Sequence, residues 1–245
     1  MFLKLAGVLV LSLVTFIPQQ KKVTIWMAGD STMSIKDVKA YPETGWGMPF
    51  IYFFDSTVTV QNKAKNGRST KTCISEGIWK SITGNISEGD YVFIQFGHND
   101  EVKEKVNTYT TPEEFRANLK RFIAEARDKK GIPVLLTPVS RRKFESGVAM
   151  ETHAQYSPLV REVAKETKVA FVDMDTKSRE LYQQMGEEQS KLLFLQLAAG
   201  EHPNYPAGKI DNTHFSELGA RKIAQIALAE IRTLLPDLAA RIIKR

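Results

Sequence analysis

Five short apolar runs, rich in β-branched and aromatic residues, recur along the chain between longer stretches of helical pattern. Unbroken apolar runs of this length are typical of strands that are buried on both faces. Their alternation with helices indicates a parallel sheet that is covered on both sides. The sequence therefore predicts an α/β fold, a three-layer sandwich whose central, mostly parallel five-stranded sheet has helices on both faces. The expected strands cover residues 23–28, 57–62, 91–96, 133–137 and 169–174.

The helix expected over residues 112–130 carries the clearest local signals. Thr111 can cap its N-terminus, Pro112 suits the first turn, and Glu114 completes a capping box. Gly131 follows its end, where glycine is favoured. No internal repeat or low-complexity linker interrupts the pattern, so residues 22–245 are predicted to form a single domain. Further helices are expected over residues 158–167, 176–197 and 217–235.

Residues 1–21 differ from the rest of the chain. Lys4 is followed by an apolar core from Leu5 to Ile17, which is typical of a secretory signal peptide and is short for a membrane span. Cleavage is expected between about Phe16 and Lys22. The mature protein would then be exported to the periplasm or the cell exterior, without stable membrane insertion. Because an A-x-A cleavage site is missing, a retained membrane anchor is the alternative.

The chain carries a formal net charge of +6, and this charge is spread along the sequence. The balance favours an acidic partner, while the lack of a dense basic tract or DNA-binding motif argues against nucleic acid. Cys73 is the one cysteine, which excludes an intrachain disulfide and a cysteine-based metal cluster. We expect it to be a small core residue, with a catalytic thiol as the alternative. Nothing in the sequence indicates an oligomeric state.

Polar or flexible residues follow three of the predicted strands. Ser31 comes after the first strand, Gly67 lies in an Asn-Gly turn after the second, and Asn99 follows the third. Ligands of open α/β sheets bind at the carboxyl ends of the strands. Ser31 can therefore be an exposed nucleophile, and Asn99 can donate a hydrogen bond into a cleft. The alternatives are a helix cap for Ser31, a plain turn for Gly67 and a turn cap for Asn99.

Asp211 and His214 precede the last predicted helix and are three residues apart. Within one turn, the carboxylate can hold one imidazole nitrogen and leave the other free to act as a base. The alternative is a surface turn in which Ser216 caps the following helix. An isolated Asp-x-x-His is a weak signal, so the pair gains meaning only with the three blocks that come before it.

Together the four blocks resemble the SGNH (GDSL-type) hydrolase family over residues 24–235. The family pattern appears in order: Gly-Asp-Ser, a glycine, Gly-x-Asn-Asp and Asp-x-x-His. Gly-Asp-Ser-Thr replaces the usual Gly-Asp-Ser-Leu. With Gly45-Trp46-Gly47 and the segments 96–100 and 137–142, it is similar to the rhamnogalacturonan acetylesterase branch. The resemblance implies an SGNH/flavodoxin-like fold, and the G-x-S-x-G elbow of α/β-hydrolases is absent.

The resemblance implies a role for each block in acyl transfer. Ser31 would attack the ester, His214 would carry its proton, and Asp211 would orient the imidazole. The backbone N–H groups of Ser31 and Gly67, with the side-chain amide of Asn99, would form the oxyanion hole that such a reaction needs. The family requires no metal and no organic cofactor.

The function implied is an exported carbohydrate esterase, a serine ester hydrolase that removes O-acetyl groups from pectic rhamnogalacturonan. The alternatives are an SGNH esterase or lipase acting on lipid, peptidoglycan or another glycan ester, and a non-catalytic sugar-binding module. An acidic polysaccharide would suit the basic chain.

Arg68 and the pair Arg141 and Arg142 follow strand ends and could bind substrate carboxylates, while His98 could shape the pocket. In the plainer interpretation Arg68 pairs with Glu76, and residues 141–143 form a solvated turn. The remaining histidines, His153 and His202, lie in polar loops, and no catalytic role is predicted for either.

Overall fold

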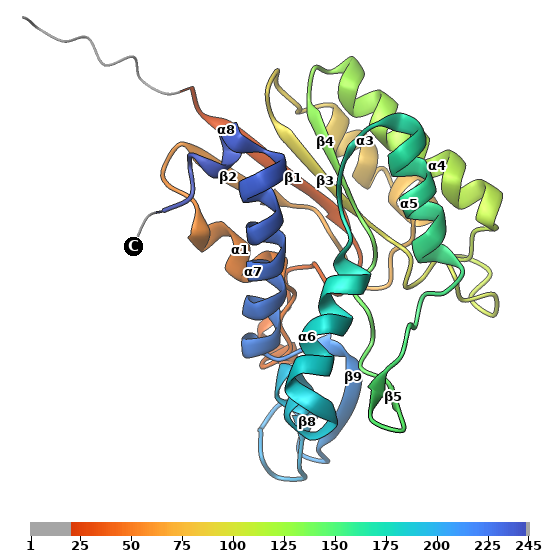
Figure 1. Cartoon of the computed structure of the whole chain (residues 1–245), viewed down its shortest axis with the longest axis vertical. Helices are drawn as coiled ribbons and strands as arrows, with labels where there is room; N and C mark the ends of the chain where they lie inside the picture. The colour runs from red at the N-terminus through yellow and green to blue at the C-terminus, as the bar shows by residue number, and fades with distance from the viewer. Residues whose placement is uncertain (1–20, 244–245) are drawn as a thin grey trace, which may run out of the picture.

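The computed structural model describes residues 21–243, and its centre is a five-stranded sheet (Figure 1). Every neighbouring pair in this sheet is parallel. Each strand overlaps one predicted apolar run, which confirms the fold class and the parallel sheet. In spatial order the strands are β2 (Val58–Asn62), β1 (Val23–Gly29), β3 (Tyr91–Gln95), β4 (Ile132–Leu136) and β7 (Ala170–Val172).

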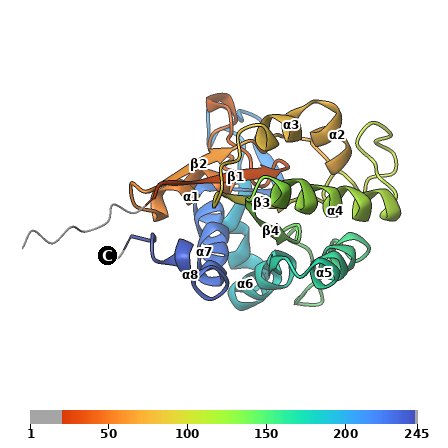
Figure 2. The ribbon, with the colours of Figure 1, turned by 90° about the horizontal axis from the view of Figure 1, so that it is seen from above.

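Side chains of the sheet contribute to two hydrophobic cores, one on each face, because successive strand residues point to opposite faces. On β1, Ile25 and Met27 enter one core, and Trp26 and Ala28 enter the other. Helices cover both faces (Figure 2), which confirms the three-layer sandwich. The first face carries α1 (Gly47–Phe50), α6 (Met174–Gln189), α7 (Glu217–Leu234) and α8 (Pro236–Ala239). The second carries α2 (Thr70–Ser75), α3 (Ile78–Thr83), α4 (Pro112–Asp128) and α5 (Tyr156–Thr167).

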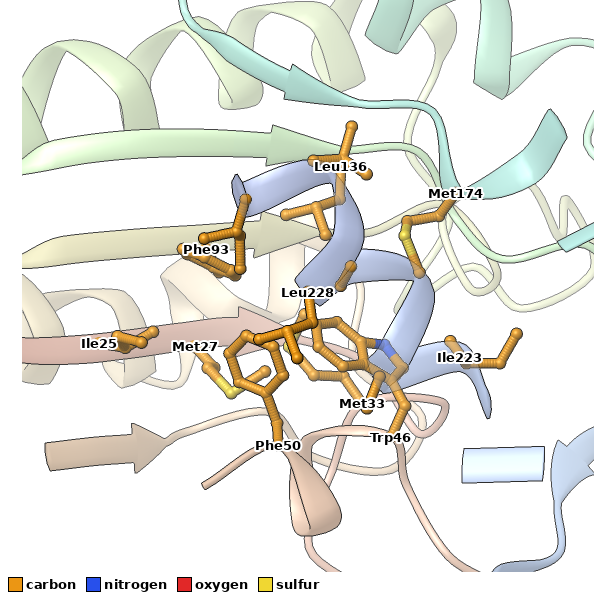
Figure 3. Packing of buried hydrophobic residues seen from close by; sticks show 14 of the residues in the cluster. Ile25, Met27, Met33, Trp46, Phe50, Phe93, Leu136, Met174, Ile223 and Leu228 are labelled. Carbon is orange, nitrogen blue, oxygen red and sulfur yellow. The ribbon is translucent and has the colours of Figure 1, made fainter. Parts of the chain in front are cut away.

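Aromatic rings at α1 anchor the first core (Figure 3). Trp46 packs edge-on against Phe50, with 5.4 Å between ring centroids, and Phe50 contacts Phe93 of β3 at 5.7 Å. Ile223 and Leu228 of α7 belong to the same buried cluster. Burying one such side chain stabilises the fold by about 1.5–3 kcal/mol. The packing fixes the segment around Trp46 against the sheet, close to the end of β1.

The predicted features of α4 are confirmed. The Thr111 side chain accepts a hydrogen bond from the Glu114 backbone, and the Glu114 carboxylate accepts one from the Thr111 backbone. Pro112 occupies the first turn, and the helix ends at Asp128, two residues before the predicted end. Helices α5 and α7 also lie where they were predicted, with Ser216 capping α7.

The helix predicted over residues 176–197 is confirmed as far as Gln189 and is wrong beyond it. Helix α6 ends at Gln189, a 3₁₀ turn η3 (Ser190–Leu193) follows, and the next residues form strand β8 (Phe194–Leu197). Strand β8 pairs antiparallel with β9 (Lys209–Phe215). Gly186, with φ at +77°, already interrupts the helix. The pairing partner is distant in sequence, so the apolar residues at this point fit a helix and a strand equally well.

Several short elements were not predicted, among them two strands and two 3₁₀ turns. A small hairpin pairs β5 (Phe144–Glu145) with β6 (Val148–Ala149), and two 3₁₀ turns, η1 (Val38–Ala40) and η2 (Ile51–Phe53), lie on either side of α1. Elements this short carry too few residues to show a period in the sequence.

Cys73 is buried on α2, which confirms its expected place in the core. Burial raises the pKa of its thiol to about 12, so the nucleophilic thiolate is not available at neutral pH. Over residues 21–243, no helix combines the length and the apolar character needed to cross a membrane. The predicted signal peptide lies outside the described residues, apart from Lys21.

A substitution at Gly219 tests the structure found for residues 190–197, because the first turn of α7 packs directly on η3. A Cβ atom at Gly219 would lie 1.8 Å from the carbonyl oxygen of Leu193. Alanine normally stabilises a helix interior relative to glycine by about 1 kcal/mol. We expect Gly219→Ala to lower the free energy of unfolding in urea by about 1–3 kcal/mol instead, through overpacking. The neighbouring half-exposed Leu218→Ala is the control, and a more stable Gly219→Ala protein would contradict the packing described.

Candidate active site

Ser31 lies in a tight turn that begins where β1 ends. The Asp30 carboxylate accepts hydrogen bonds from the backbone and the hydroxyl of Thr32, at 2.9 and 2.8 Å. The Asp30 carbonyl accepts two more, from the backbones of Met33 and Ser34. Asp30 therefore holds the turn closed, and Ser31 does not cap a helix. Its side chain is left free to face the residues of β9.

The segment Gly45-Trp46-Gly47 packs against the turn formed by residues 30–34. A Cβ atom at Gly45 would lie 1.9 Å from the Ser34 carbonyl oxygen, so only glycine fits. The Trp46 backbone donates to the Thr32 carbonyl at 2.8 Å, and its indole donates to the Gln95 side chain at 2.6 Å. These contacts couple the turn to the aromatic core around Trp46.

His214 lies between Ser31 and Asp211. Its Nε2 is 2.9 Å from the Ser31 Oγ, and its Nδ1 is 2.8 Å from the Asp211 Oδ2. The other Asp211 oxygen accepts from the backbones of Thr213 and His214, at 2.8 and 2.9 Å. The structure thus brings together the three residues that the sequence predicted as nucleophile, base and orienting carboxylate.

Asp211 and His214 were predicted to share a turn before the last helix, and instead they lie within β9. Phe215 pairs with Phe194 and Ile210 pairs with Gln196, so residues 211–214 stand opposite a single residue of β8. Such a bulge bends a strand and redirects its side chains. The bulge, rather than a turn, brings the carboxylate to the imidazole.

Burial by itself would raise the pKa of Asp211, but the hydrogen bonds from the side chain and backbone of His214 outweigh it and hold that pKa well below its usual range. Asp211 is therefore an anion at neutral pH and can only accept hydrogen bonds. In the neutral imidazole of His214, Nδ1 is then the donor, which leaves Nε2 as an acceptor for the Ser31 hydroxyl.

Gly67 and Asn99 flank Ser31 from the two strands beside β1. The backbone of Lys63 donates to Met27 and that of Lys65 to Gly29, so the chain beyond β2 continues alongside β1. Asn66, which precedes Gly67, accepts a hydrogen bond from the Ser34 hydroxyl at 2.6 Å, so Gly67 lies close to the turn that carries Ser31. The Asn99 amide donates to the Arg68 carbonyl at 2.9 Å, which joins the loop after β3 to the loop after β2.

These three residues hold unused donors. Within residues 21–243, the backbone N–H groups of Ser31 and Gly67 have no hydrogen-bond acceptor, and Asn99 uses only one of its two amide hydrogens. Gly67 has a φ of +74°, in the left-handed region that favours glycine. Donors of this kind are the groups that an oxyanion hole needs.

The structure places the proposed substrate-binding arginines in other contacts. Arg68 pairs with Glu76 at 2.9 Å, as in the plainer interpretation, and Arg141 pairs with Glu101 at 2.8 Å. Arg142 is only 9% exposed, and its guanidinium bonds to Ser190, Asn212 and the Glu187 carbonyl. It lies inside the protein rather than in a solvated turn, and it fastens the β9 bulge that carries His214.

His98 is buried against Asp30, in the turn formed by residues 30–34. Its Nδ1 is 3.2 Å from the Asp30 Oδ2, and its ring lies 4.4 Å from that of His153. His153 is also buried and contacts Glu101 at 3.0 Å. The contacts support a structural role for His98, through Asp30. His202 lies in an outer loop and accepts from the Asn204 backbone.

Sequence reasoning missed Lys36. Its ammonium is buried and donates to the Ser31 carbonyl at 2.5 Å. A single lysine in a polar segment normally lies on the surface, and no spacing in the sequence marks this one as different. Among residues 21–243, no group of three or more histidine, cysteine or acidic side chains could hold a metal ion.

Residues 29–222 match the model of the GDSL-like lipase/acylhydrolase family. The chain belongs to this family, and it is therefore an ester hydrolase. It is 40% identical to the rhamnogalacturonan acetylesterase RhgT of Bacillus subtilis, over 88% of this chain and 92% of that protein. It is also 34% identical to YesY of the same organism, named a probable rhamnogalacturonan acetylesterase, over 90% and 97% of the two chains.

Two solved structures share the fold at lower identity. YxiM of Bacillus subtilis superposes with a TM-score of 0.75 and 24% identity, over 86% of this chain and 56% of that one. A catalytic mutant of Axe2, an acetylxylan esterase from Geobacillus stearothermophilus, superposes with a TM-score of 0.63 and 20% identity, over 86% and 94%. At these identities the likeness establishes the fold.

The burial of His98 predicts a pH dependence of stability. Burial lowers its pKa from 6.5 to about 4, although Asp30 opposes the shift. Between those values the unfolded chain binds more protons, so stability falls as the pH drops from 6.5 toward 4. Relative to His98→Gln, the wild type should lose on the order of 3 kcal/mol of unfolding free energy over this window. Urea unfolding at pH 7 and pH 4.5 measures the difference.

His202→Gln is the matched control, because it removes a histidine that is not fully buried. It should follow the wild-type pH dependence. An identical loss of stability on acidification in the wild type and in His98→Gln would show that His98 is not the group that titrates.

Proposed function

We propose that the protein is an exported carbohydrate esterase that removes O-acetyl groups from pectic rhamnogalacturonan, through a Ser31–His214–Asp211 acyl-enzyme mechanism. The observation that carries the mechanism is the contact chain from the Ser31 hydroxyl through His214 to Asp211, next to three free hydrogen-bond donors. The substrate rests on the 40% identity to RhgT, which is named a rhamnogalacturonan acetylesterase.

The first half-reaction transfers the acetyl group to Ser31. As the Oγ attacks the ester carbonyl, its proton passes to the Nε2 of His214, and the imidazolium is stabilised by ionised Asp211. The carbonyl oxygen becomes an oxyanion, which accepts hydrogen bonds from the N–H groups of Ser31 and Gly67 and from the Asn99 amide. When the intermediate collapses, the carbon–oxygen bond to the sugar breaks, and His214 returns the proton to the departing hydroxyl.

The second half-reaction releases acetate. Water replaces the sugar, loses a proton to the Nε2 of His214 and attacks the acetyl carbonyl of the acyl-enzyme. The same three donors stabilise the second oxyanion. Collapse breaks the bond between the acetyl carbon and the Ser31 Oγ, which recovers its proton from His214. Both steps use residues of this chain alone.

Export is part of the proposal and rests on residues 1–21. A charged start, an apolar core from Leu5 to Ile17 and a polar stretch from Gln19 are the parts of a secretory signal peptide. A pectic polymer is too large to enter a cell intact, so its esterase must meet it outside the cytoplasm. The net positive charge of the chain would attract the galacturonate carboxylates at long range.

The proposal is tested by acetate release from acetylated rhamnogalacturonan, acetylated xylan, acetylated peptidoglycan and long-chain p-nitrophenyl esters. We expect kcat/KM to be highest on rhamnogalacturonan, and Ser31→Ala to lower kcat on it by about 10⁴-fold or more. Faster acetate release from xylan or peptidoglycan would overturn the proposed substrate but would leave the proposed mechanism unchanged.

Ser75→Ala is the matched control for the nucleophile, since Ser75 is an exposed serine on α2. It should retain wild-type kcat. If folded Ser31→Ala protein also turned over ester at the wild-type rate, Ser31 would not be the nucleophile, whatever the preferred substrate.

A further inference from the structure

Lys36 is a buried cation that the proposed mechanism does not use. Its side chain is only 2% exposed. The ammonium lies 2.5 Å from the Ser31 carbonyl oxygen, 2.8 Å from the Asn66 Oδ1 and 2.7 Å from the Glu43 carboxylate. An ammonium has three hydrogens and no acceptor, so these three oxygens account for its full donor capacity.

Burial of a charge is costly unless it is paired and hydrogen-bonded. Burial lowers the pKa of Lys36, while the hydrogen bond and charge of Glu43 act in the opposite direction. Glu43, whose side chain is 14% exposed, supplies the counter-charge. A lysine on the surface would not incur this desolvation cost. The contacts of the buried Lys36 ammonium must therefore offset it.

Two of those contacts join the segments that carry the proposed oxyanion donors. Ser31 supplies one backbone N–H, and its own carbonyl accepts from Lys36. Asn66 directly precedes Gly67, and its side chain accepts from the same ammonium. We propose that Lys36 is a positioning residue that sets the distance and orientation between the Ser31 and Gly67 N–H groups, and thereby preorganises the oxyanion hole.

The Ser34 hydroxyl reaches the same two oxygens, at 3.2 Å from the Ser31 carbonyl and 2.6 Å from the Asn66 Oδ1. A hydroxyl has one hydrogen, so it can donate to only one of the two at a time. Lys36 bonds both simultaneously, and hydrogen bonds from a charged donor are roughly twice as strong as neutral ones. Ser34 therefore supports the link but cannot replace it.

The inference rests on the proposed function, since it assigns the oxyanion hole a support. Loss of that support should act on the transition state more than on substrate binding, because the negative charge appears only as the ester is attacked. Lys36→Met keeps the length of the side chain and removes its donors. We expect it to lower kcat on p-nitrophenyl acetate by about 10- to 100-fold, with KM changed by no more than about twofold.

Phenylboronic acid provides a readout that a merely structural role would not move. It forms a tetrahedral adduct with an active-site serine, so its Ki should rise in Lys36→Met by about the same factor as kcat falls. The exposed Lys39→Met, three residues along the same segment, is the matched control and should match the wild type in both measurements.

A mutant cycle with Asn66→Ala tests whether Lys36 acts through Asn66. If the two residues form one link, the double variant should lose little more kcat than Lys36→Met alone. Should Lys36→Met fold poorly because Glu43 is left unpaired, Lys36→Met/Glu43→Gln removes that charge and should still show the low kcat. Wild-type kcat and Ki in folded protein of either Lys36 variant would overturn the proposal.

The assay also separates this inference from the proposed function. p-Nitrophenyl acetate needs no polysaccharide recognition, so the comparison holds even if rhamnogalacturonan is not the substrate. Full activity of folded Ser31→Ala on the same ester would instead overturn the serine mechanism, and with it the oxyanion hole that Lys36 is proposed to support.

Discussion

The position of β1 between β2 and β3 is the constraint on which the whole site depends. The chain leaves β1, forms β2 on one side and then returns to form β3 on the other. Connections that run in opposite directions from one strand leave a crevice at its carboxyl end. Ser31 follows β1 at this end of the sheet, while Gly67 and Asn99 follow its two neighbours. Backbone pairing in the sheet thus brings the three loops that carry the proposed oxyanion donors to the same end of the sheet.

The second half of the site depends on irregular structure outside the sheet. The β9 bulge carries Asp211 and His214 toward Ser31, and Arg142 ties it to the loop after β4 and to the end of α6. Burying an arginine charge without partners would strongly destabilise the fold. The hydrogen bonds of Arg142 to Ser190 and Asn212 therefore hold these two segments in place. The hydrogen bond between Ser31 and His214 therefore joins two parts of the fold. Ser31 is held at the end of the central sheet, and His214 is held by the β9 bulge.

The sequence predicted what depends on local pattern. The five strands are long, unbroken apolar runs, and the capping box of α4 lies within four residues, so both could be recognised without knowing the fold. The strand β8 could not, because Phe194 becomes a strand residue only by pairing with Phe215. Lys36 and Arg142 were missed or misassigned for a related reason. Their burial is determined by partners such as Glu43 and Asn212, which the sequence alone does not place beside them.

Ser31, His214 and the three donors are proposed to act as one acyl-transfer site. The most direct measurement is a crystal structure of the protein after reaction with a small organophosphate. We expect a single phosphoryl group on the Ser31 Oγ, with one phosphoryl oxygen within hydrogen-bond distance of the Ser31 N, the Gly67 N and the Asn99 Nδ2. A label on another residue, or a phosphoryl oxygen turned away from Gly67 and Asn99, would contradict it.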